Sequence, residues 1–248
     1  DPDNHTIYPS LLSIKGLSQG CGNDLYSLGK KKFKNFYELW KELKKKKSLN
    51  SAKINTLIEI GYFDDFGSIG KIKRFVEILD KLYERSQFSK TNPPKEFISY
   101  IMKYSEATDK QYRKFDYNTA LNEIWNDLDD VEIPFNERLK YELNNIGYVK
   151  TVMPDMLPDY AFVQEYECKY KNPKLTLYRL CDGSTEVVKV RRKKYDEAPI
   201  NVGDIIKTLE CSDEGRWSKD ANGDWQQSQT DHECILKKWS FVRDNVTE

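Results

Sequence analysis

The sequence has little of the residue types from which most catalytic and metal centres are built. It contains only two histidines, His5 and His232. None of its five cysteines lies in a Cys-x-x-Cys pair; they are Cys21, Cys168, Cys181, Cys211 and Cys234. We therefore expect no metal and no other cofactor. An odd number of cysteines without a ligand pattern favours reduced thiols and a cytoplasmic location.

Long apolar segments and nucleotide-binding motifs are also missing. No apolar run approaches the ~20 residues of a membrane span. The chain has no phosphate-binding P-loop and no nucleophile elbow of the hydrolases. A mean hydropathy of −0.77 and a charged fraction of 32% predict a soluble protein. Its 248 residues are enough for two domains, and because it begins with Asp1 we interpret it as a fragment of a longer polypeptide.

The net charge of zero hides a strong asymmetry along the chain. Residues 1–50 hold ten lysines and five acidic residues, whereas residues 106–145 hold ten acidic and five basic residues. Nucleic acids respond to such local charge rather than to the total. We predict phosphate contacts for Lys30, Lys31 and Lys32; the alternative is that this run is only a solvated helix end.

Two short turns within the first 53 residues share a pattern typical of backbone-binding helix pairs. The first runs from Ile14 to Gly20 and the second from Ser48 to Lys53. A glycine turn that opens a helix points free N–H groups outward, where a phosphate can bind. The pair predicts a tandem helix-hairpin-helix that grips the nucleic-acid backbone; an ordinary helix connection is the alternative. The candidate DNA-binding residues in the turns are Lys15, Gly16, Leu17, Ser18, Gly20, Asn50, Ser51 and Lys53.

The periodicity of apolar residues changes near Gly147. Before it, apolar residues recur at helical spacing in several segments, such as Phe36 to Leu43 and Ile72 to Tyr83. After it, short β-like runs alternate with turn signals such as Asp182-Gly183. We predict an α+β chain, with an all-helical domain over residues 1–150 that carries the tandem helix-hairpin-helix. A small β-barrel domain resembling the OB fold follows over residues 151–248.

We expect aromatic and basic residues of the β region to bind single-stranded nucleic acid. Small barrels of the OB type use exposed aromatics and a basic groove for this purpose. The alternative for the basic run near residue 192 is a charged edge strand that guards against aggregation. We expect the tryptophans Trp217, Trp225 and Trp239 to pack in the core or in turns. The candidates for contact with DNA are Tyr166, Tyr170, Tyr178, Arg179, Lys189, Arg191, Arg192, Lys193 and Tyr195.

Three sequence blocks resemble a known family. IKGLSQG, KFKNFYELWKEL and SLNSAKINTLIEIGYFDDFG are similar to the tandem helix-hairpin-helix region of the bacterial replicative DNA polymerase III alpha subunit. The family pattern "LIKAGAFDxFG" matches Leu57–Gly67 nearly position by position, whereas Ser18 replaces the second glycine of the "AIKGVGE" turn. A weaker likeness to "E…LGFYLSGHPL" covers Glu142–Tyr148 and Met153-Pro154, with methionine at the family's histidine.

The resemblance covers most of the chain and is most specific in residues 11–67. It implies an OB-fold in the β region and a non-catalytic, DNA-binding portion of a polymerase, because the palm region that carries catalysis in that family has no counterpart here. In the family, a glutamine followed by an aliphatic–aromatic pair binds the sliding clamp. Gln111 and Phe115 are the matching candidates here, although Lys114 stands at the aliphatic position and the segment can also be a lead-in to a helix.

Two other functional classes stay open. In the first, the hairpins only pack the helices, and the acidic residues 106–145 and the β region dock a replisome partner. In the second, carboxylate pairs such as Asp64-Asp65 and Asp129-Asp130 form a metal-dependent nuclease site. Duplex binding distinguishes the first alternative from a DNA-binding role, and metal-dependent cleavage tests the second.

Overall fold

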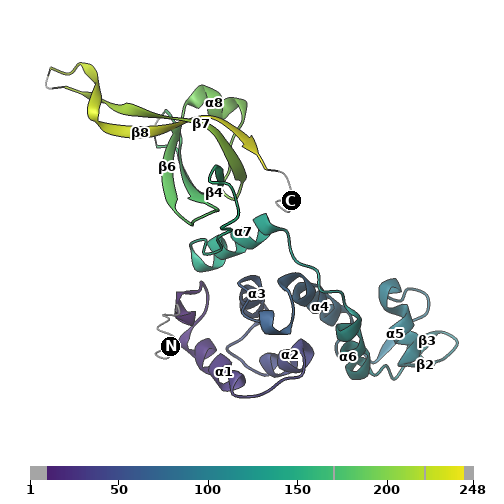
Figure 1. Cartoon of the computed structure of the whole chain (residues 1–248). Coiled ribbons are helices and arrows are strands. Elements are labelled where there is room, and N and C mark those ends of the chain that lie inside the picture. Colours follow the sequence, from purple (N-terminus) through teal and green to yellow (C-terminus); the bar gives the residue numbers. More distant parts are fainter. Residues whose placement is uncertain (1–9, 170, 221, 243–248) are drawn as a thin grey trace. The chain divides into compact units, whose positions relative to one another are not determined.

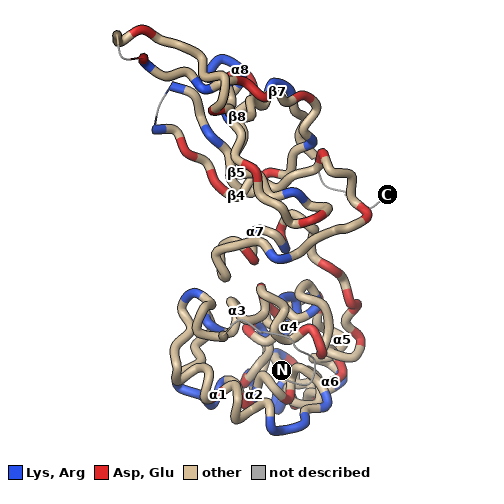
Figure 2. Tube along the Cα trace, turned by 60° about the vertical axis from the view of Figure 1, so that its left-hand side comes forward, with Lys and Arg blue, Asp and Glu red and all other residues tan. Residues whose placement is uncertain are grey.

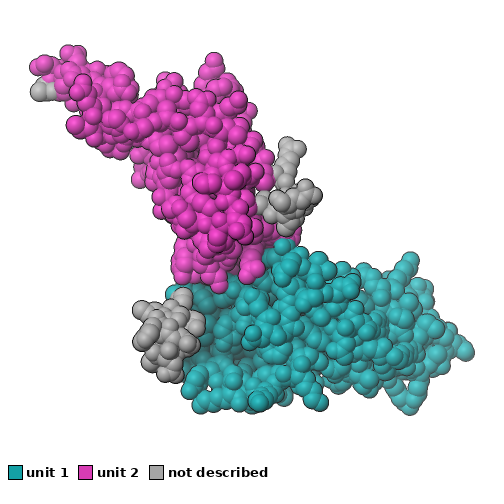
Figure 3. All heavy atoms as spheres, in the orientation of Figure 1, with its two compact units in different colours: residues 1–133 teal, residues 134–248 magenta. Residues whose placement is uncertain are grey.

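The computed structural model describes residues 10–169, 171–220 and 222–242. The chain divides after Ile133 into two compact units, residues 1–133 and residues 134–248 (Figure 3). Helices dominate the first unit and strands dominate the second, so the expected α+β class is confirmed. Within the described ranges, no helix is long and apolar enough to cross a membrane.

The first unit packs its helices around a core rich in aromatic rings. Phe75 lies 4.9 Å from Trp125 and 6.5 Å from Phe36, measured between ring centroids. These rings come from three separate helices and are buried, so the apolar stripes of the sequence do form the core. The α-helices of this unit are α1 (Gln19–Gly29), α2 (Phe36–Lys44), α3 (Ser51–Glu59), α4 (Ile69–Leu82), α5 (Ile98–Lys103) and α6 (Tyr117–Asp127) (Figure 1). The 3-10 helices are η1 (Leu11–Ser13), η2 (Asp64–Phe66) and η3 (Lys95–Phe97).

A small antiparallel sheet interrupts the helices of the first unit, a feature that the sequence did not predict. Its strands are β1 (Gln87–Ser89), β2 (Glu106–Ala107) and β3 (Gln111–Arg113), with β3 in the middle. Strands of two or three residues are too short to give a period of two, which explains why the pattern was missed.

The second unit begins with α7 (Phe135–Ile146) and continues as a closed five-stranded barrel. The strand order is β4-β5-β6-β8-β7, and β4 pairs with β7 to close the ring. Among the strand pairs of the barrel that the structure describes, β6 with β8 is parallel and the others are antiparallel. The small barrel that we expected is therefore confirmed. Its elements are β4 (Tyr160–Glu167), β5 (Lys174–Arg179), β6 (Thr185–Val190), α8 (Arg192–Glu197), β7 (Ile205–Lys219) and β8 (Trp225–Phe241).

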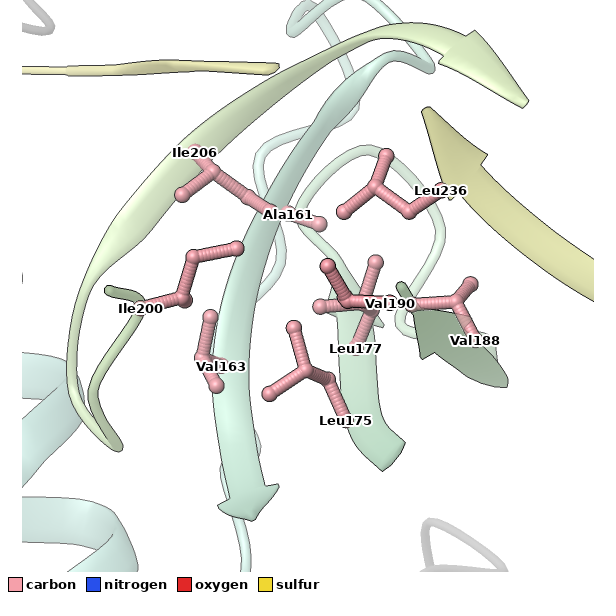
Figure 4. Close-up of a cluster of buried hydrophobic side chains, with 9 residues drawn as sticks. All are labelled: Ala161, Val163, Leu175, Leu177, Val188, Val190, Ile200, Ile206 and Leu236. Carbon is pink, nitrogen blue, oxygen red and sulfur yellow. The ribbon is translucent and has the colours of Figure 1, made fainter. Parts of the chain in front are cut away.

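Alternating residues of the five strands fill the barrel. Figure 4 shows nine side chains that point toward one another from the strands and from the connection before β7. Leu177 and Val188 are fully buried, as the period of two requires for the inner face of a strand. The last two strands are much longer than the rest, and their paired ends extend beyond the barrel as a two-stranded arm (Figure 1).

The division of the chain differs from the expected boundary at residue 150 because α7 packs with the barrel. Leu139 of α7 belongs to the same buried cluster as Phe162 and Tyr178. Glu142, also buried, accepts hydrogen bonds from the backbone N–H groups of Lys150 and Thr151 at 2.9 and 3.0 Å. The helical spacing of apolar residues in α7 led us to place it in the helical domain. Its tertiary contacts place it in the second unit, with the barrel.

Candidate nucleic-acid interface

The first predicted turn forms a tight, exposed loop before α1. The N–H of Leu17 donates to the carbonyl oxygen of Ile14 at 3.2 Å, and Ile14 is buried and anchors the loop. Gly16 has a φ of +81°, a backbone conformation that favours glycine, and no atom lies within 4 Å of the position of a Cβ there. Lys15 and Gly16 are exposed. A phosphate can therefore approach this backbone closely.

The helix that follows this loop begins without a side-chain cap. Ser18 occupies the N-cap position in an extended conformation, but its hydroxyl makes no capping bond to the helix. The hydroxyl oxygen instead lies 3.2 Å from the Sγ of Cys21. Ser18 and Gly20 are exposed, so the first turn of α1 faces solvent with its positive dipole end. The serine at this position therefore does not cover the helix end.

The second turn, between α2 and α3, is occupied by contacts within the protein. The side chain of Asn50 caps α3 by accepting a hydrogen bond from the N–H of Lys53 at 3.0 Å. The Nζ of Lys53 donates to the carbonyl oxygen of Ser48 at 2.9 Å and to the Sγ of Cys21 at 3.3 Å. Lys53 therefore holds the turn together in this structure, while Ser51 is exposed.

Hydrogen bonds fix the two turns to one another. The thiol of Cys21, at the start of α1, donates to the carbonyl oxygen of Ser48 at 3.1 Å. Asp24 of α1 accepts a hydrogen bond from the Ser48 hydroxyl at 2.5 Å and pairs with Lys46 at 3.1 Å. Burial raises the pKa of Cys21, but hydrogen bonds from Ser18 and Lys53 outweigh it and lower the pKa below its ordinary value. The hydrogen bonds from Ser48 and Lys46 also lower the pKa of Asp24.

The lysines that follow α1 meet the lysines of α2 around a hollow of about 810 Å³. Figure 2 shows the blue lysine and arginine positions in the loops next to these helices. Glu42 lies between the two groups and pairs with Lys45 and, at 2.9 Å, with Lys31. These two lysines lower its pKa to about 2. Lys32 is exposed and lines the hollow, and the Nζ of Lys30 lies 4.4 Å above the ring of Tyr26.

The basic run of the barrel lies at the start of α8 and not on an edge strand. Arg191 precedes this helix and pairs with Glu214 at 3.1 Å. Arg192 pairs with Asp196 at 2.9 Å, and Lys193 is exposed. These three residues line a groove of about 400 Å³ together with Lys171, Asn172, Lys189, Glu214, Trp217, Glu233 and Ile235.

Several of the aromatic residues that we expected to contact DNA instead make contacts within the barrel unit. Tyr178 is only 4% exposed, and its hydroxyl donates to the carbonyl oxygen of Thr151 at 3.1 Å. It is therefore covered rather than free to stack on a base. Tyr166 and Tyr195 stack on each other at 5.4 Å between ring centroids, and Arg179 forms an ion pair with Glu186. The remaining candidate, Tyr170, lies outside the described residues.

Two of the three tryptophans that we expected to be packed are exposed to solvent. Trp239 packs against the barrel core, as predicted. Trp217 and Trp225, in contrast, are 56% and 61% exposed on the arm of β7 and β8. The prediction of a packed position was wrong for these two because the paired ends of β7 and β8 extend beyond the barrel core. Lys171, which also lines the groove, was not among the candidates, because it lies outside the strands and the denser basic run near residue 192.

The candidate clamp-binding segment is part of the small sheet. Gln111 begins the middle strand β3 and is half-buried. Phe115 is 4% exposed and packs edge-on against Phe88 at 5.2 Å between ring centroids. Binding of this segment by a partner therefore requires the small sheet to open.

Asp130, a member of one of the two carboxylate pairs, is tied to local structure. Asp130 accepts a hydrogen bond from the N–H of Ser68 at 2.8 Å and so supports the start of α4. Hydrogen bonding from the Ser68 side chain, and then from its backbone N–H, lowers the pKa of Asp130 below its ordinary value. Among the residues that the structure describes, no group of three or more histidine, cysteine or acidic side chains is placed to hold a metal ion.

Comparison with known proteins identifies one motif. Residues 1–71 match the family description of the helix-hairpin-helix motif, and the first nine of these lie outside the described residues. No curated protein and no solved structure matches the chain. The matched part spans α1, α2 and α3 with both turns. A helix-hairpin-helix indicates DNA binding through the backbone, without choice of sequence.

Proposed function

We propose that this chain is the non-catalytic DNA-binding portion of a replicative DNA polymerase alpha subunit. The first unit holds the DNA backbone through the turn at Gly16 and through nearby lysines. The observation that carries this proposal is the uncapped start of α1 behind an open glycine turn, within a matched helix-hairpin-helix motif. Such a site binds phosphates whatever the base sequence.

In this proposal, some of the lysines around the turns contact phosphates and others hold the turns in place. Lys15 and Lys32 are exposed, and no ion pair to either is found among the described residues. They supply the charge that attracts phosphates and releases counterions. Lys53 and Lys46 hold the second turn to α1 and contribute to the shape of the site.

The barrel supports the second half of the proposal, contact with the single-stranded template. An OB fold is a five-stranded barrel that binds oligonucleotides on the face of its second and third strands and on nearby loops. The barrel here has five strands, a parallel pair between its third and fifth, and a helix between its third and fourth. Its groove carries five basic side chains and two acidic ones, which come from the third strand β6, from β7 and β8, and from the segments before β5 and after β6.

A fluorescence-anisotropy titration with a labelled primer–template DNA at two salt concentrations tests the proposal. We expect binding that weakens steeply with salt, because counterions released from phosphates supply most of the free energy. The double variant Lys15→Glu, Lys32→Glu should bind more weakly regardless of sequence. The double variant Lys95→Glu, Lys110→Glu, which changes the net charge equally but at exposed positions by the small sheet, is the control.

Two results would contradict the proposal. If the wild-type chain does not bind at low salt, a partner-docking module becomes the better explanation. If both double variants lose affinity equally, the charge acts without a site and the turn at Gly16 has no special part.

A further inference from the structure

The arm formed by the ends of β7 and β8 carries two large aromatic side chains in solvent. Trp217 and Trp225 are more than half exposed. Exposed tryptophan of this extent costs hydrophobic free energy unless something covers it. Both residues lie in the antiparallel pairing of Trp217–Lys219 with Trp225–Gln227, which follows a register shift after Gly215, so backbone pairing fixes their positions relative to each other.

The register places both rings on one face of the arm. Trp217 is opposite Gln227, and Lys219 is opposite Trp225. Directly opposite residues share a face, and so do residues two apart on a strand. Trp217 and Trp225 are therefore diagonal neighbours, about 7–8 Å apart at the backbone. The Nζ of Lys219 lies 5.7 Å from the ring centroid of Trp225, so the face is both aromatic and basic.

This face continues into the basic groove of the barrel. Trp217 itself lines the groove, together with Lys171 and Lys193. The other basic residues of the groove have partners, such as Lys189 with Glu233 at 2.8 Å. For Lys171 and Lys193 the described residues supply no ion-pair partner. Their charge is therefore available to an anionic ligand.

We propose that the arm stacks the bases of a single DNA strand whose phosphates follow the basic groove. This proposal rests on the proposed function, and it assigns the stacking to the two tryptophans of the arm. Stacking on a ring requires unpaired bases, which excludes an intact duplex as the ligand. The excess of basic side chains in the groove favours a polyanion over an apolar protein surface.

Anisotropy titrations of labelled oligo(dT) against tryptophan variants test this assignment. We expect Trp217→Ala and Trp225→Ala each to weaken binding by about 5- to 150-fold, because aromatic stacking contributes roughly this much per base. The variants Trp217→Phe and Trp225→Phe keep a ring and should retain most of the affinity. Trp239→Phe, a change at a tryptophan packed on the core, is the matched control and should bind as the wild type does.

The outcomes separate this proposal from the function of the helical unit. Wild-type oligo(dT) affinity in both alanine variants, with salt-sensitive duplex binding intact, overturns the stacking proposal alone. If the wild-type chain binds oligo(dT) in a tryptophan-dependent way but does not bind duplex DNA, the proposed backbone binding by the helical unit is overturned instead. An equal loss in Trp239→Phe, or tighter binding of oligo(U) than of oligo(dT), also overturns the assignment.

Discussion

Lys15 lies in the loop before α1 and Lys53 lies in the first turn of α3. We predict different effects when each is changed to methionine. Lys53→Met should destabilise the helical unit, because it removes hydrogen bonds from Nζ to the Ser48 carbonyl oxygen and to the Cys21 Sγ. A hydrogen bond from a charged group contributes about 1.5–3 kcal/mol. Lys53 is half-buried, and the Ser48 carbonyl keeps its bond from the Cys21 thiol. We therefore expect a loss of about 1 kcal/mol.

Lys15→Met should leave stability within about 0.5 kcal/mol, because Lys15 is exposed and its side chain has no hydrogen bond or ion pair among the described residues. It should instead lower duplex affinity and reduce the slope of log affinity against log salt by about 0.9, the value for one phosphate contact. Methionine keeps an unbranched side chain in both variants, so the comparison removes charge and hydrogen bonding with little change in shape.

Thermal unfolding followed by far-ultraviolet circular dichroism measures the first effect, and anisotropy at several salt concentrations measures the second. A loss of 1 kcal/mol should lower the midpoint of the helical transition by roughly 2–6 °C. The reasoning is refuted if Lys53→Met unfolds as the wild type does while it lowers the salt slope as much as Lys15→Met. That result would mean that Lys53 reaches a phosphate and that its internal bonds do not form in solution.

Three further predictions follow from single positions. Gly16→Ala should destabilise the helical unit by about 1 kcal/mol, because the φ of +81° disfavours a side chain. Gly22→Ala is the contrasting change, because Gly22 lies within α1 and has equal space for an added Cβ; it should stabilise the unit by about 0.5–1 kcal/mol. Thermal unfolding measures both effects. Phe115→Ala should cost about 3–5 kcal/mol of local stability, and unchanged unfolding would restore the segment as an accessible partner site. The hydrogen bond to Asp213 raises the pKa of His232. The stability from this ion pair is therefore present below the ordinary pKa of histidine, while Asp213 stays ionised, and is lost as pH rises through the raised pKa. Nuclear magnetic resonance titration should show Asp213→Asn returning the pKa of His232 toward its ordinary value.

The turns and the helices were predictable because their signals are local. A glycine at Gly16 and a capping asparagine at Asn50 act on the backbone within three residues of themselves. The helix starts at Gln19 and Ser51 follow directly from them. The same holds for the Asp182-Gly183 turn, because glycine adopts a φ of +74° between β5 and β6.

The directions of side chains were not predictable, because their partners are distant in the sequence. The Nζ of Lys53 turns toward Cys21, which lies in another helix. Tyr178 is covered by the segment that contains Thr151, so an aromatic residue in a strand became part of the core. The arm was missed for a related reason. A strand that leaves the barrel has no buried face, and the polar sequence around Trp217 then gives no period of two.

The contacts between the two turns have a consequence for the proposed function. The Cys21 thiol bonds to the Ser48 carbonyl oxygen, and Asp24 pairs with Lys46, so the first turn of α1 is fixed to the second turn. Under the proposed function, this constraint presents the open turn at Gly16 to a phosphate in a set orientation, which reduces the ordering that binding must pay for. The buried cysteine therefore serves geometry and not chemistry: its burial and its three polar contacts fix the first turn of α1 against the second hairpin.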